Sequence, residues 1–309
     1  MTPEVVLIRG GQADAVRSRI RSDFPEVRVL DDEAAHPATT IIAGRVRDEE
    51  LPGLPALAWV HSWAAGVESE VGPVLRGSGV TVTSSAGNGA VPLAEHAMLL
   101  ALQLDRGGHR WSDAARGARW DRFVHGELAG KTMGIYGFGN IGAALAPRAS
   151  AFDMTVIGLR RDVGRTPAAV DRLYRPEEVL DFAGRCDVLV VTAPLTVETR
   201  GAIDLRVLSA LRPGATVVVV SRGGIVVDAD LLTALDSGAV AGAGLDAHTV
   251  EPLPADSPFW SRDDVVVTPH NGATTPATAD RGTAIFLDNL RRRVTEEPLV
   301  NRVDPNSLA

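Results

Sequence analysis

The stretch that most constrains the fold spans residues 131–161 and reads KTMGIYGFGNIGAALAPRASAFDMTVIGLRR. An apolar run at 132–136 precedes a glycine-rich turn. An Ala- and Leu-rich segment and a second apolar run, at 154–159, follow it. This order predicts a strand, a tight turn, a helix and a second strand. A glycine-rich turn is informative only in this context, between a strand and the start of a helix.

Each glycine of the turn has a physical reason to be there. Gly137 permits the tight turn, Gly139 lets a pyrophosphate approach the backbone, and Gly142 lets the helix pack closely on the strand. The first amides of a helix have no partner inside the helix, and the helix dipole attracts an anion to them. A purely structural turn is the alternative, but the complete context favours a dinucleotide-binding turn. The turn comprises Gly137, Phe138, Gly139, Asn140, Ile141 and Gly142.

The end of the second predicted strand should contact the adenosine ribose. An Asp or Glu about 20 residues after the glycines usually binds the 2′-hydroxyl of NAD. Arg160 and Arg161 stand there instead. A guanidinium group matches phosphate geometry with paired donors. The two arginines either face solvent or bind a 2′-phosphate. We predict the second, and therefore NADP ahead of NAD as the cofactor.

Composition narrows the class of protein. The chain has 309 residues, 45% of them hydrophobic and 23% charged, as in an ordinary globular protein of one or two domains. A net charge of −8 argues against non-specific binding to nucleic acid. Cys186 is the single cysteine, so no intramolecular disulfide and no metal site are predicted. The sequence lacks a secretory signal and an apolar run of the ~20 residues that span a bilayer. We therefore expect a cytoplasmic protein without a membrane partner.

Short apolar runs alternate with helical segments on both sides of the central stretch. This alternation predicts an α/β protein with parallel sheets. Strands are predicted at 5–9, 27–30, 40–43, 57–61, 80–83, 187–192, 215–220, 240–245 and 265–268. Helices are predicted at 14–23, 92–104, 177–182, 204–211, 228–236 and 274–294.

Two loops and one connecting segment in the first part of the chain attract attention. Loops 61–67 and 84–89 each follow a predicted strand, where open α/β sheets bind ligands. Small residues before Gly66 would expose amides to a carboxylate, although both loops equally fit ordinary connections. The basic segment 106–123 contains Trp111 and Trp120. It is either a packed connector or, with the apolar helix before it, a protein interface.

Three residues able to act on a carbonyl group follow predicted strands: Arg222, Glu251 and His270. Each alone fits an ordinary surface or loop position, but together they form a working catalytic set. Arg222 can bind a carboxylate and a carbonyl oxygen with its forked donors. His270 can protonate a carbonyl oxygen, and Glu251 can orient the imidazole and favour its protonated form.

Six segments carry a resemblance to a known family: GKTMGIYGFGNIG, APLTVETRGAID, SRGGIVVDADLL, GAGLDAHTVEPLP, SPFW and TPH. The chain resembles the D-isomer-specific 2-hydroxyacid dehydrogenases, of the glyoxylate/hydroxypyruvate reductase kind, over nearly its whole length. The resemblance implies a doubly wound parallel-sheet (Rossmann) cofactor domain, residues 93–274. It would be inserted into a flavodoxin-like substrate (catalytic) domain, residues 1–92 and 275–309. It also implies hydride transfer between NAD(P)H and C2 of a small 2-oxo acid or D-2-hydroxy acid, and a homodimer formed through residues 92–123.

The resemblance also assigns roles to residues. The catalytic arginine, glutamate and histidine match Arg222 in SRGG, Glu251 in EPLP and His270 in TPH. The substrate carboxylate is expected on the amides of Ala65, Gly66 and Val67, with Arg222 beside it. Further cofactor contacts are expected at Ala193, Pro194, Thr196, Ser221, Asp246 and His270.

The sequence departs from the family pattern at several positions: Val219 stands where Asn is common, and Ala229 where Glu is common. Residues 271–276 differ from the commoner bulky-apolar version, and Arg160 stands where NAD-type members carry Asp. A nucleotide-sensing, corepressor-like binding protein and a phosphoglycerate-type dehydrogenase share the fold. A formate dehydrogenase is disfavoured because Glu251 is present. Glyoxylate, hydroxypyruvate and bulkier 2-oxo acids all fit the mechanism.

Overall fold

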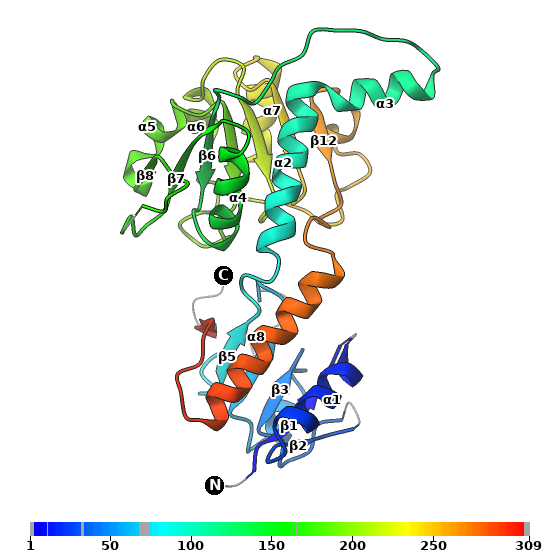
Figure 1. Cartoon of the computed structure of the whole chain (residues 1–309), viewed down its shortest axis with the longest axis vertical. Helices are drawn as coiled ribbons and strands as arrows, with labels where there is room; N and C mark the ends of the chain where they lie inside the picture. Colours follow the sequence, from blue (N-terminus) through cyan, green and yellow to red (C-terminus); the bar gives the residue numbers. More distant parts are fainter. Residues whose placement is uncertain (1–2, 11, 32–33, 68–74, 165, 306–309) are drawn as a thin grey trace. The chain divides into compact units, whose positions relative to one another are not determined.

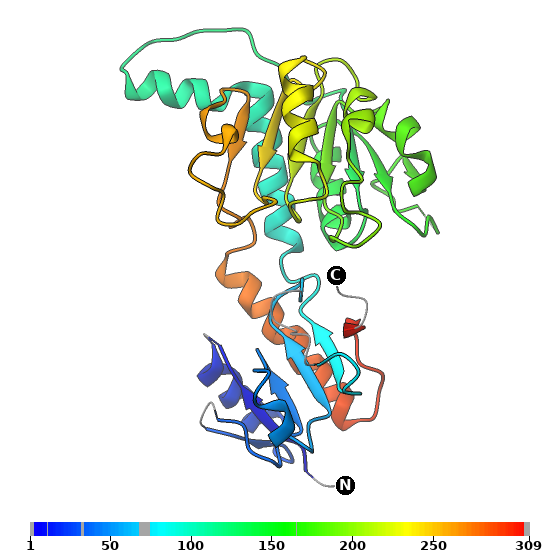
Figure 2. The ribbon, with the colours of Figure 1, turned by 180° about the vertical axis from the view of Figure 1, so that it is seen from behind.

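The computed structural model describes residues 3–10, 12–31, 34–67, 75–164 and 166–305. The chain divides into two compact units (Figure 1 and Figure 2). The terminal unit comprises Met1–Gly89 and Thr275–Ala309, and the central unit comprises Ala90–Thr274. In the described part of the chain, no helix is both long and apolar enough to cross a membrane.

The terminal unit is built on a sheet with the strand order β13-β5-β4-β3-β1-β2. Its strands are β1 (Val5–Ile8), β2 (Arg28–Val29), β3 (Ile41–Ala43), β4 (Trp59–Ser62), β5 (Thr81–Ser84) and β13 (Arg302–Val303). The first five pair in parallel, and β13 pairs antiparallel with β5. The order 2-1-3-4-5 is that of flavodoxin-like folds, so the predicted fold of this unit is confirmed.

Successive side chains along the strands of this sheet point to opposite faces and pack into two hydrophobic cores. Val6 and Ile8 face α1 (Ala13–Asp23) and α8 (Pro276–Val294), whereas Leu7 faces the opposite core with residues around η1 (Leu51–Gly53). Successive side chains of a strand point to opposite faces, so a strand that is apolar throughout must be covered on both.

The central unit contains a sheet with the strand order β12-β11-β10-β9-β6-β7-β8, all neighbours parallel. Its strands are β6 (Thr132–Tyr136), β7 (Thr155–Leu159), β8 (Arg172–Tyr174), β9 (Val188–Val191), β10 (Thr216–Val219), β11 (Gly242–Leu245) and β12 (Val265–Val267). Read from β8 to β11, this is the doubly wound order 3-2-1-4-5-6 of dinucleotide-binding domains. The topological switch point lies between β6 and β9.

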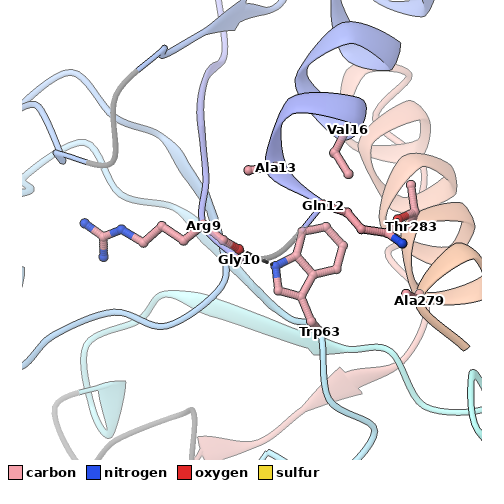
Figure 3. A pocket seen from close by; sticks show the side chains of 9 residues that line it. Arg9, Gly10, Gln12, Ala13, Val16, Trp63, Ala279 and Thr283 are labelled. Atoms are coloured by element: carbon pink, nitrogen blue, oxygen red, sulfur yellow. Dashed lines mark hydrogen bonds between the residues drawn. The ribbon is translucent and has the colours of Figure 1, made fainter. Parts of the chain in front are cut away.

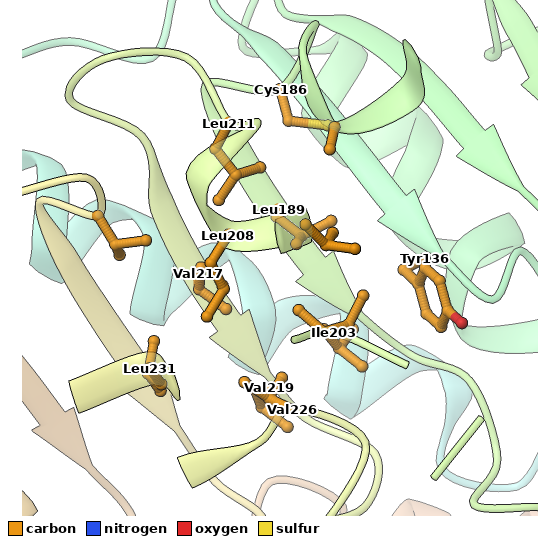
Figure 4. Packing of buried hydrophobic residues seen from close by; sticks show 14 of the residues in the cluster. Tyr136, Cys186, Leu189, Ile203, Leu208, Leu211, Val217, Val219, Val226 and Leu231 are labelled. Atoms are coloured by element: carbon orange, nitrogen blue, oxygen red, sulfur yellow. The ribbon is translucent and has the colours of Figure 1, made fainter. Parts of the chain in front are cut away.

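Helices cover both faces of this sheet. They are α2 (Ala90–Arg106), α3 (Gly108–Arg116), α4 (Asn140–Ser150), α5 (Val179–Ala183), α6 (Leu205–Ser209) and α7 (Asp228–Asp236), with the short turns η3 (Pro176–Glu178) and η4 (Pro258–Ser261). Val218 packs with α2 and α4, whereas Val217 and Val219 pack with α6 and α7 (Figure 4). The sheet is therefore buried on both faces, and the edge formed by its carboxyl ends is where loops can carry a site.

The sequence predicted most of these elements within two residues, but it missed the shortest ones. Strands β8 and β13 were not predicted because each has at most three residues and includes an arginine. Helix α3 was not predicted because its sequence, GHRWSDAAR, is mostly polar. The strand predicted at 27–30 is reduced to Arg28–Val29 at the sheet edge.

Candidate active site

The glycine turn after β6 has the shape that its sequence predicted. Gly137 has φ +91°, and a Cβ there would lie 2.4 Å from the Ala193 backbone, so no side chain fits. A Cβ on Gly142 would lie 3.1 Å from Ile135 and Phe138, which shows how closely α4 packs on β6. At Gly139, by contrast, a Cβ would approach nothing nearer than a backbone oxygen at 3.9 Å. Protein packing therefore does not require a glycine at 139, which agrees with space kept for a ligand.

The amino end of α4 presents unpaired donors beside this turn. The amides of Asn140, Ile141 and Gly142 donate no hydrogen bond to any acceptor in the described residues. The neighbouring loop after β9 is held in place, because Thr192 Oγ1 donates to the Gly137 carbonyl at 2.9 Å. Farther along that loop, Thr199 Oγ1 donates to the Pro194 carbonyl at 2.7 Å and the Thr196 amide donates to Thr199 Oγ1 at 2.8 Å. Three converging amides at a helix amino end fit a pyrophosphate.

Five side-chain polar atoms in the described part of the central unit are buried without a hydrogen bond: Asp105 Oδ2, Arg106 Nε, His109 Nδ1, Arg160 Nε and Ser221 Oγ. Arg160 and Ser221 are the two of these residues that the sequence predicts as cofactor contacts. Buried polar atoms are nearly always satisfied, so these two positions fit polar atoms of a bound nucleotide. Arg161 is exposed, and the nearby Glu198 carboxyl has its pKa lowered by a hydrogen bond from Thr196 and, less, by Arg161.

The three candidate catalytic residues follow three neighbouring strands. Arg222 comes after β10, Glu251 after β11 and His270 after β12, and these strands pair side by side in parallel. The loop after β10 lies directly on the loop after β11, because a Cβ on Gly223 would be 2.0 Å from the His248 carbonyl carbon. The central unit thus brings the three loops together at one edge of its sheet.

Glu251 and His270 form a direct pair. His270 Nδ1 lies 2.8 Å from both carboxylate oxygens, and the two side chains are 36% and 38% exposed. The His248 amide donates to Glu251 Oε1 at 2.9 Å. Burial alone would raise the pKa of Glu251, but the hydrogen bonds from His248 and His270 outweigh burial and lower that pKa. The carboxylate is therefore ionised. His270 Nε2 makes no hydrogen bond among the described residues, so it remains available to a substrate.

Asp246 fixes the loop that carries His270. Its buried carboxylate accepts hydrogen bonds from Thr268 Oγ1 at 2.7 Å, the Asn271 amide at 3.1 Å and the Gly272 amide at 3.0 Å. Burial alone would raise the pKa of Asp246. Hydrogen bonds from His96, Thr268 and Gly272 outweigh burial and lower it to about 2. His96, on α2, was not predicted, because a single polar residue on an apolar helix carries no signal of its own.

The same contacts explain the glycine at position 272. A Cβ on Gly272 would lie 2.8 Å from Asp246 Oδ2 and 2.9 Å from the His96 ring. A bulkier residue would push the catalytic loop away from its carboxylate anchor. His270 itself has φ +50°, an uncommon conformation for a residue with a side chain, and the anchored loop must hold it there.

In the loop after β4, in the terminal unit, the carbonyl groups of residues 62–64 accept hydrogen bonds. The Ser85 amide donates to the carbonyls of Ser62 at 3.0 Å and Ala64 at 3.1 Å, and Asn88 Nδ2 donates to the Trp63 carbonyl at 3.2 Å. The following three amides donate no hydrogen bond within the described part of the chain. They belong to Ala65, Gly66 and Val67. Consecutive unpaired amides on a fixed loop form a concave site for an anion.

The strand order and the glycine turn of the central unit are those of a dinucleotide-binding domain. The model of the D-isomer specific 2-hydroxyacid dehydrogenase, NAD binding domain, matches residues 98–272. The chain belongs to this family.

Individual relatives give the same result. The chain is 32% identical over 332 residues to a glyoxylate reductase of Pyrococcus furiosus, covering 98% of this chain and 96% of that protein. It superposes with a TM-score of 0.84 on a D-isomer specific 2-hydroxyacid dehydrogenase of Xanthobacter autotrophicus Py2, in complex with NADPH and MES. That match has 29% identity and covers 99% of each chain. The chain is also 32% identical to the D-3-phosphoglycerate dehydrogenase of Bacillus subtilis over 85% of its own length, but spans only 51% of that protein.

Proposed function

We propose that this protein reduces a small 2-oxo acid to the D-2-hydroxy acid with NAD(P)H, in the manner of a glyoxylate or hydroxypyruvate reductase. The observation that carries the proposal is the Glu251–His270 pair on the loops beside Arg222. An imidazole held at Nδ1 by an ionised carboxylate is oriented to donate a proton from Nε2. The family membership and the likeness to a glyoxylate reductase support the same reaction.

Each residue then has one task. The nicotinamide supplies a hydride to C2 of the acid when it is bound. His270 donates its Nε2 proton to the carbonyl oxygen, and Glu251 stabilises the imidazole while it carries that proton. Arg222 binds the carbonyl and carboxylate oxygens through its forked donors, which draws electron density away from C2. Asp246 keeps the His270 loop in position through the Asn271 and Gly272 amides.

We assign the carboxylate of the acid to the amides of Ala65, Gly66 and Val67. Their lack of acceptors in the described residues supports this assignment, because unpaired amides on a fixed loop attract an anion. Residues 62–67 include no charged side chain, so this loop would bind the carboxylate through its amide dipoles.

We further propose that NADPH is the preferred cofactor. The pyrophosphate would bind the amino end of α4, and Arg160 would bind the 2′-phosphate. The buried, unpaired Nε of Arg160 supports this role. The nearest carboxylate in sequence, Asp162, accepts the Gly164 amide at 3.0 Å and so is engaged within its own loop. The structural relative from Xanthobacter contains NADPH.

A homodimer is proposed from the segment after α2. Trp120 and Val124 are 92% and 100% exposed, on a chain that returns along α3. The Phe123 ring packs on Arg110 at 4.1 Å and on Trp111 at 5.5 Å, so the segment is supported from inside while its apolar side chains face outward. Exposed large apolar groups on a supported segment are typical of an interface. Light scattering at micromolar concentration tests this proposal, and a monomer would contradict it.

The activity itself is tested with a panel of 2-oxo acids. Glyoxylate, hydroxypyruvate, pyruvate and a branched 2-oxo acid are each mixed with the protein and with NADH or NADPH, and oxidation of the nicotinamide is followed by absorbance. We expect turnover with at least one acid and a higher kcat/KM with NADPH. Nucleotide binding without turnover of any acid would instead support a nucleotide-sensing binding protein.

A further inference from the structure

His61 is a buried histidine that has no role in the proposed reaction. It lies on β4 directly before the carboxylate-binding loop, and its side chain is fully buried. Aromatic rings surround it: Phe286 at 5.3 Å, Trp63 at 5.4 Å and Trp59 at 6.2 Å between ring centres. A polar ring in such a setting must have both nitrogens satisfied.

The hydrogen bonds around His61 fix its tautomer. Ser85 Oγ lies 3.2 Å from the Ser62 carbonyl, which can only accept, so the serine proton is used there. His61 Nε2, 3.1 Å from Ser85 Oγ, must therefore donate to that oxygen. His61 Nδ1, 2.8 Å from Thr83 Oγ1, is the acceptor that the described residues offer to the threonine proton, so the threonine donates to it and the imidazole is neutral. Thr83 Oγ1 in turn accepts from Trp59 Nε1 at 2.8 Å.

This arrangement is one directed chain of hydrogen bonds. It starts at the Trp59 indole, passes through Thr83, His61 and Ser85, and ends at the Ser62 carbonyl. Each proton has one acceptor. A second proton on the imidazole would turn Nδ1 from an acceptor into a donor. The hydroxyl proton of Thr83 would then have no acceptor, which is costly in a buried site. In agreement, burial lowers the pKa of His61 to about 3.

The chain ends where the loop begins. The Ser85 amide donates to the carbonyls of Ser62 and Ala64, and the Ser85 hydroxyl also donates to the Ser62 carbonyl. The orientation of Ser85 therefore sets the direction of the amides of residues 65–67. The imidazole also supports the indole of Trp63, whose Nε1 donates to the Arg9 carbonyl at 2.7 Å (Figure 3). Another part of the same indole borders a cavity of about 200 Å³, so packing on that side is incomplete.

We infer that His61 is a positioning residue for substrate binding: its neutral imidazole, bonded to Thr83 and Ser85, holds the loop whose amides bind the carboxylate. This inference rests on the proposed function, because it takes those amides as the carboxylate site. His61 itself does not touch the substrate.

Two substitutions at one position separate positioning from bulk packing. His61→Phe keeps a ring among the aromatic residues but removes both hydrogen bonds. His61→Gln keeps a donor near the Nε2 position. Thr40→Val is the matched control, because Thr40 Oγ1 accepts from the Val5 amide at 2.9 Å at the amino end of the same sheet, away from the loop. Steady-state kinetics and hydrogen exchange of the bonded amides of Ala64 and Ser85 are measured for the parent and all three variants.

We expect His61→Phe to raise KM for the 2-oxo acid about tenfold, the loss expected for a displaced hydrogen-bonding loop. Its kcat and its KM for the nucleotide should change by less than about twofold, because an unaltered central unit carries the chemistry. The amides of Ala64 and Ser85 should exchange faster, and His61→Gln should restore most of both effects. Thr40→Val should lower Tm without changing KM.

The outcomes also separate this inference from the proposed function. If the parent reduces no 2-oxo acid, the proposed activity fails, while hydrogen exchange still tests whether His61 holds the loop. If the parent is active and His61→Phe leaves both KM and exchange at parental values, the positioning role is wrong. It is also wrong if Thr40→Val raises KM as much as His61→Phe does, because the effect would then follow general destabilisation of the unit.

Discussion

The two units each place a histidine at the carboxyl edge of a parallel sheet, and the two environments are opposite. His270 has a side chain that is 36% exposed and is paired with the ionised carboxylate of Glu251. His61 is fully buried, and among the described residues its ring nitrogens bond only to the hydroxyl groups of Thr83 and Ser85. A carboxylate stabilises a protonated imidazole, whereas a closed ring of hydroxyl partners accommodates only the neutral form.

The two histidines therefore lie in chemically different surroundings, beside a carboxylate in the central unit and among neutral groups in the terminal unit. In the central unit, the ionised carboxylate of Glu251 faces His270, and the carboxylate of Asp246 holds the His270 loop through three hydrogen bonds. In the described residues of the loop after β4, the terminal unit presents unpaired amides, oriented by a neutral network. The predictions below test each half of this contrast, from the largest effect to the smallest.

The largest effect is expected at His270. His270→Ala should lower kcat for 2-oxo acid reduction by ~10²–10⁴-fold, the usual cost of removing a general acid. Nucleotide affinity should change little, because the amino end of α4 is untouched. Stopped turnover combined with unchanged nucleotide binding by fluorescence titration would support the role. His36→Ala, an exposed histidine of the terminal unit, is the control and should keep parental turnover.

Arg222 should come next. Arg222→Lys keeps the positive charge but loses the forked donors, so KM for the acid should rise and kcat should fall together, by roughly tenfold or more in kcat/KM. Steady-state kinetics with a fixed, saturating nucleotide measure both constants. Parental values for both would remove Arg222 from the site and leave the central unit without a group that binds the acid.

How far the sequence could predict this site depends on what defines each residue. Arg222, Glu251 and His270 were predicted because strand ends and short motifs place them. Asp246 was predicted as a cofactor contact, which stays a prediction, whereas the hydrogen bonds of its carboxylate to the His270 loop were not predicted. The network of His61 was not predicted, because it depends on the register that puts His61 opposite Thr83 in the neighbouring strand. Register between distant strands cannot be obtained from a local pattern.

The fold shows the same limit. Strand β6 and helix α7 were predicted with the observed bounds, because an unbroken apolar run and a clear helical pattern define them locally. Strand β13 has two residues, and its pairing with β5 across the sequence is its only reason to be a strand. Elements that exist through long-range pairing alone leave no local signal.

Cofactor selectivity is a smaller effect that belongs entirely to the central unit. Charge-assisted hydrogen bonds to phosphate are worth about 1.5–3 kcal/mol each, and solvent reduces that value at a half-exposed group. We therefore expect a roughly ten- to hundredfold preference for NADPH in kcat/KM. Arg160→Asp should reverse or abolish it, whereas Arg206→Asp, at an exposed position on α6, should not.

The result that would contradict this assignment is specific. If the parent prefers NADH, or if Arg160→Asp leaves the ratio of the two kcat/KM values unchanged, Arg160 does not bind a 2′-phosphate. NAD would then be the cofactor, and the unpaired Nε of Arg160 would need another ligand atom, such as one of the adenine ring.

The smallest effect concerns His61 and the stability of the terminal unit. In the folded protein burial lowers the pKa of His61 to about 3, whereas an unfolded chain has the ordinary value near 6.5. Between these two values the unfolded chain binds a proton that the folded chain does not bind. The free energy of unfolding must therefore fall as the pH decreases below about 6.5, by at most about 1.4 kcal/mol per pH unit.

Between pH 5 and 6.5 this slope can be separated from that of the carboxylates. The lowered pKa values of Glu251 and Asp246 reduce stability only as the pH falls below the ordinary values for free carboxyl groups, near 4.

His61→Gln removes the titrating group and keeps a hydrogen-bond donor, so the variant should lose less stability than the parent between pH 6.5 and 5. Urea unfolding at several pH values, followed by tryptophan fluorescence, measures the two slopes. Because the other six histidines are common to both proteins, the difference between the slopes isolates His61. Equal slopes would mean that His61 takes up its proton while the protein remains folded, and the contrast between a histidine paired with a carboxylate and a buried, neutral histidine would not hold.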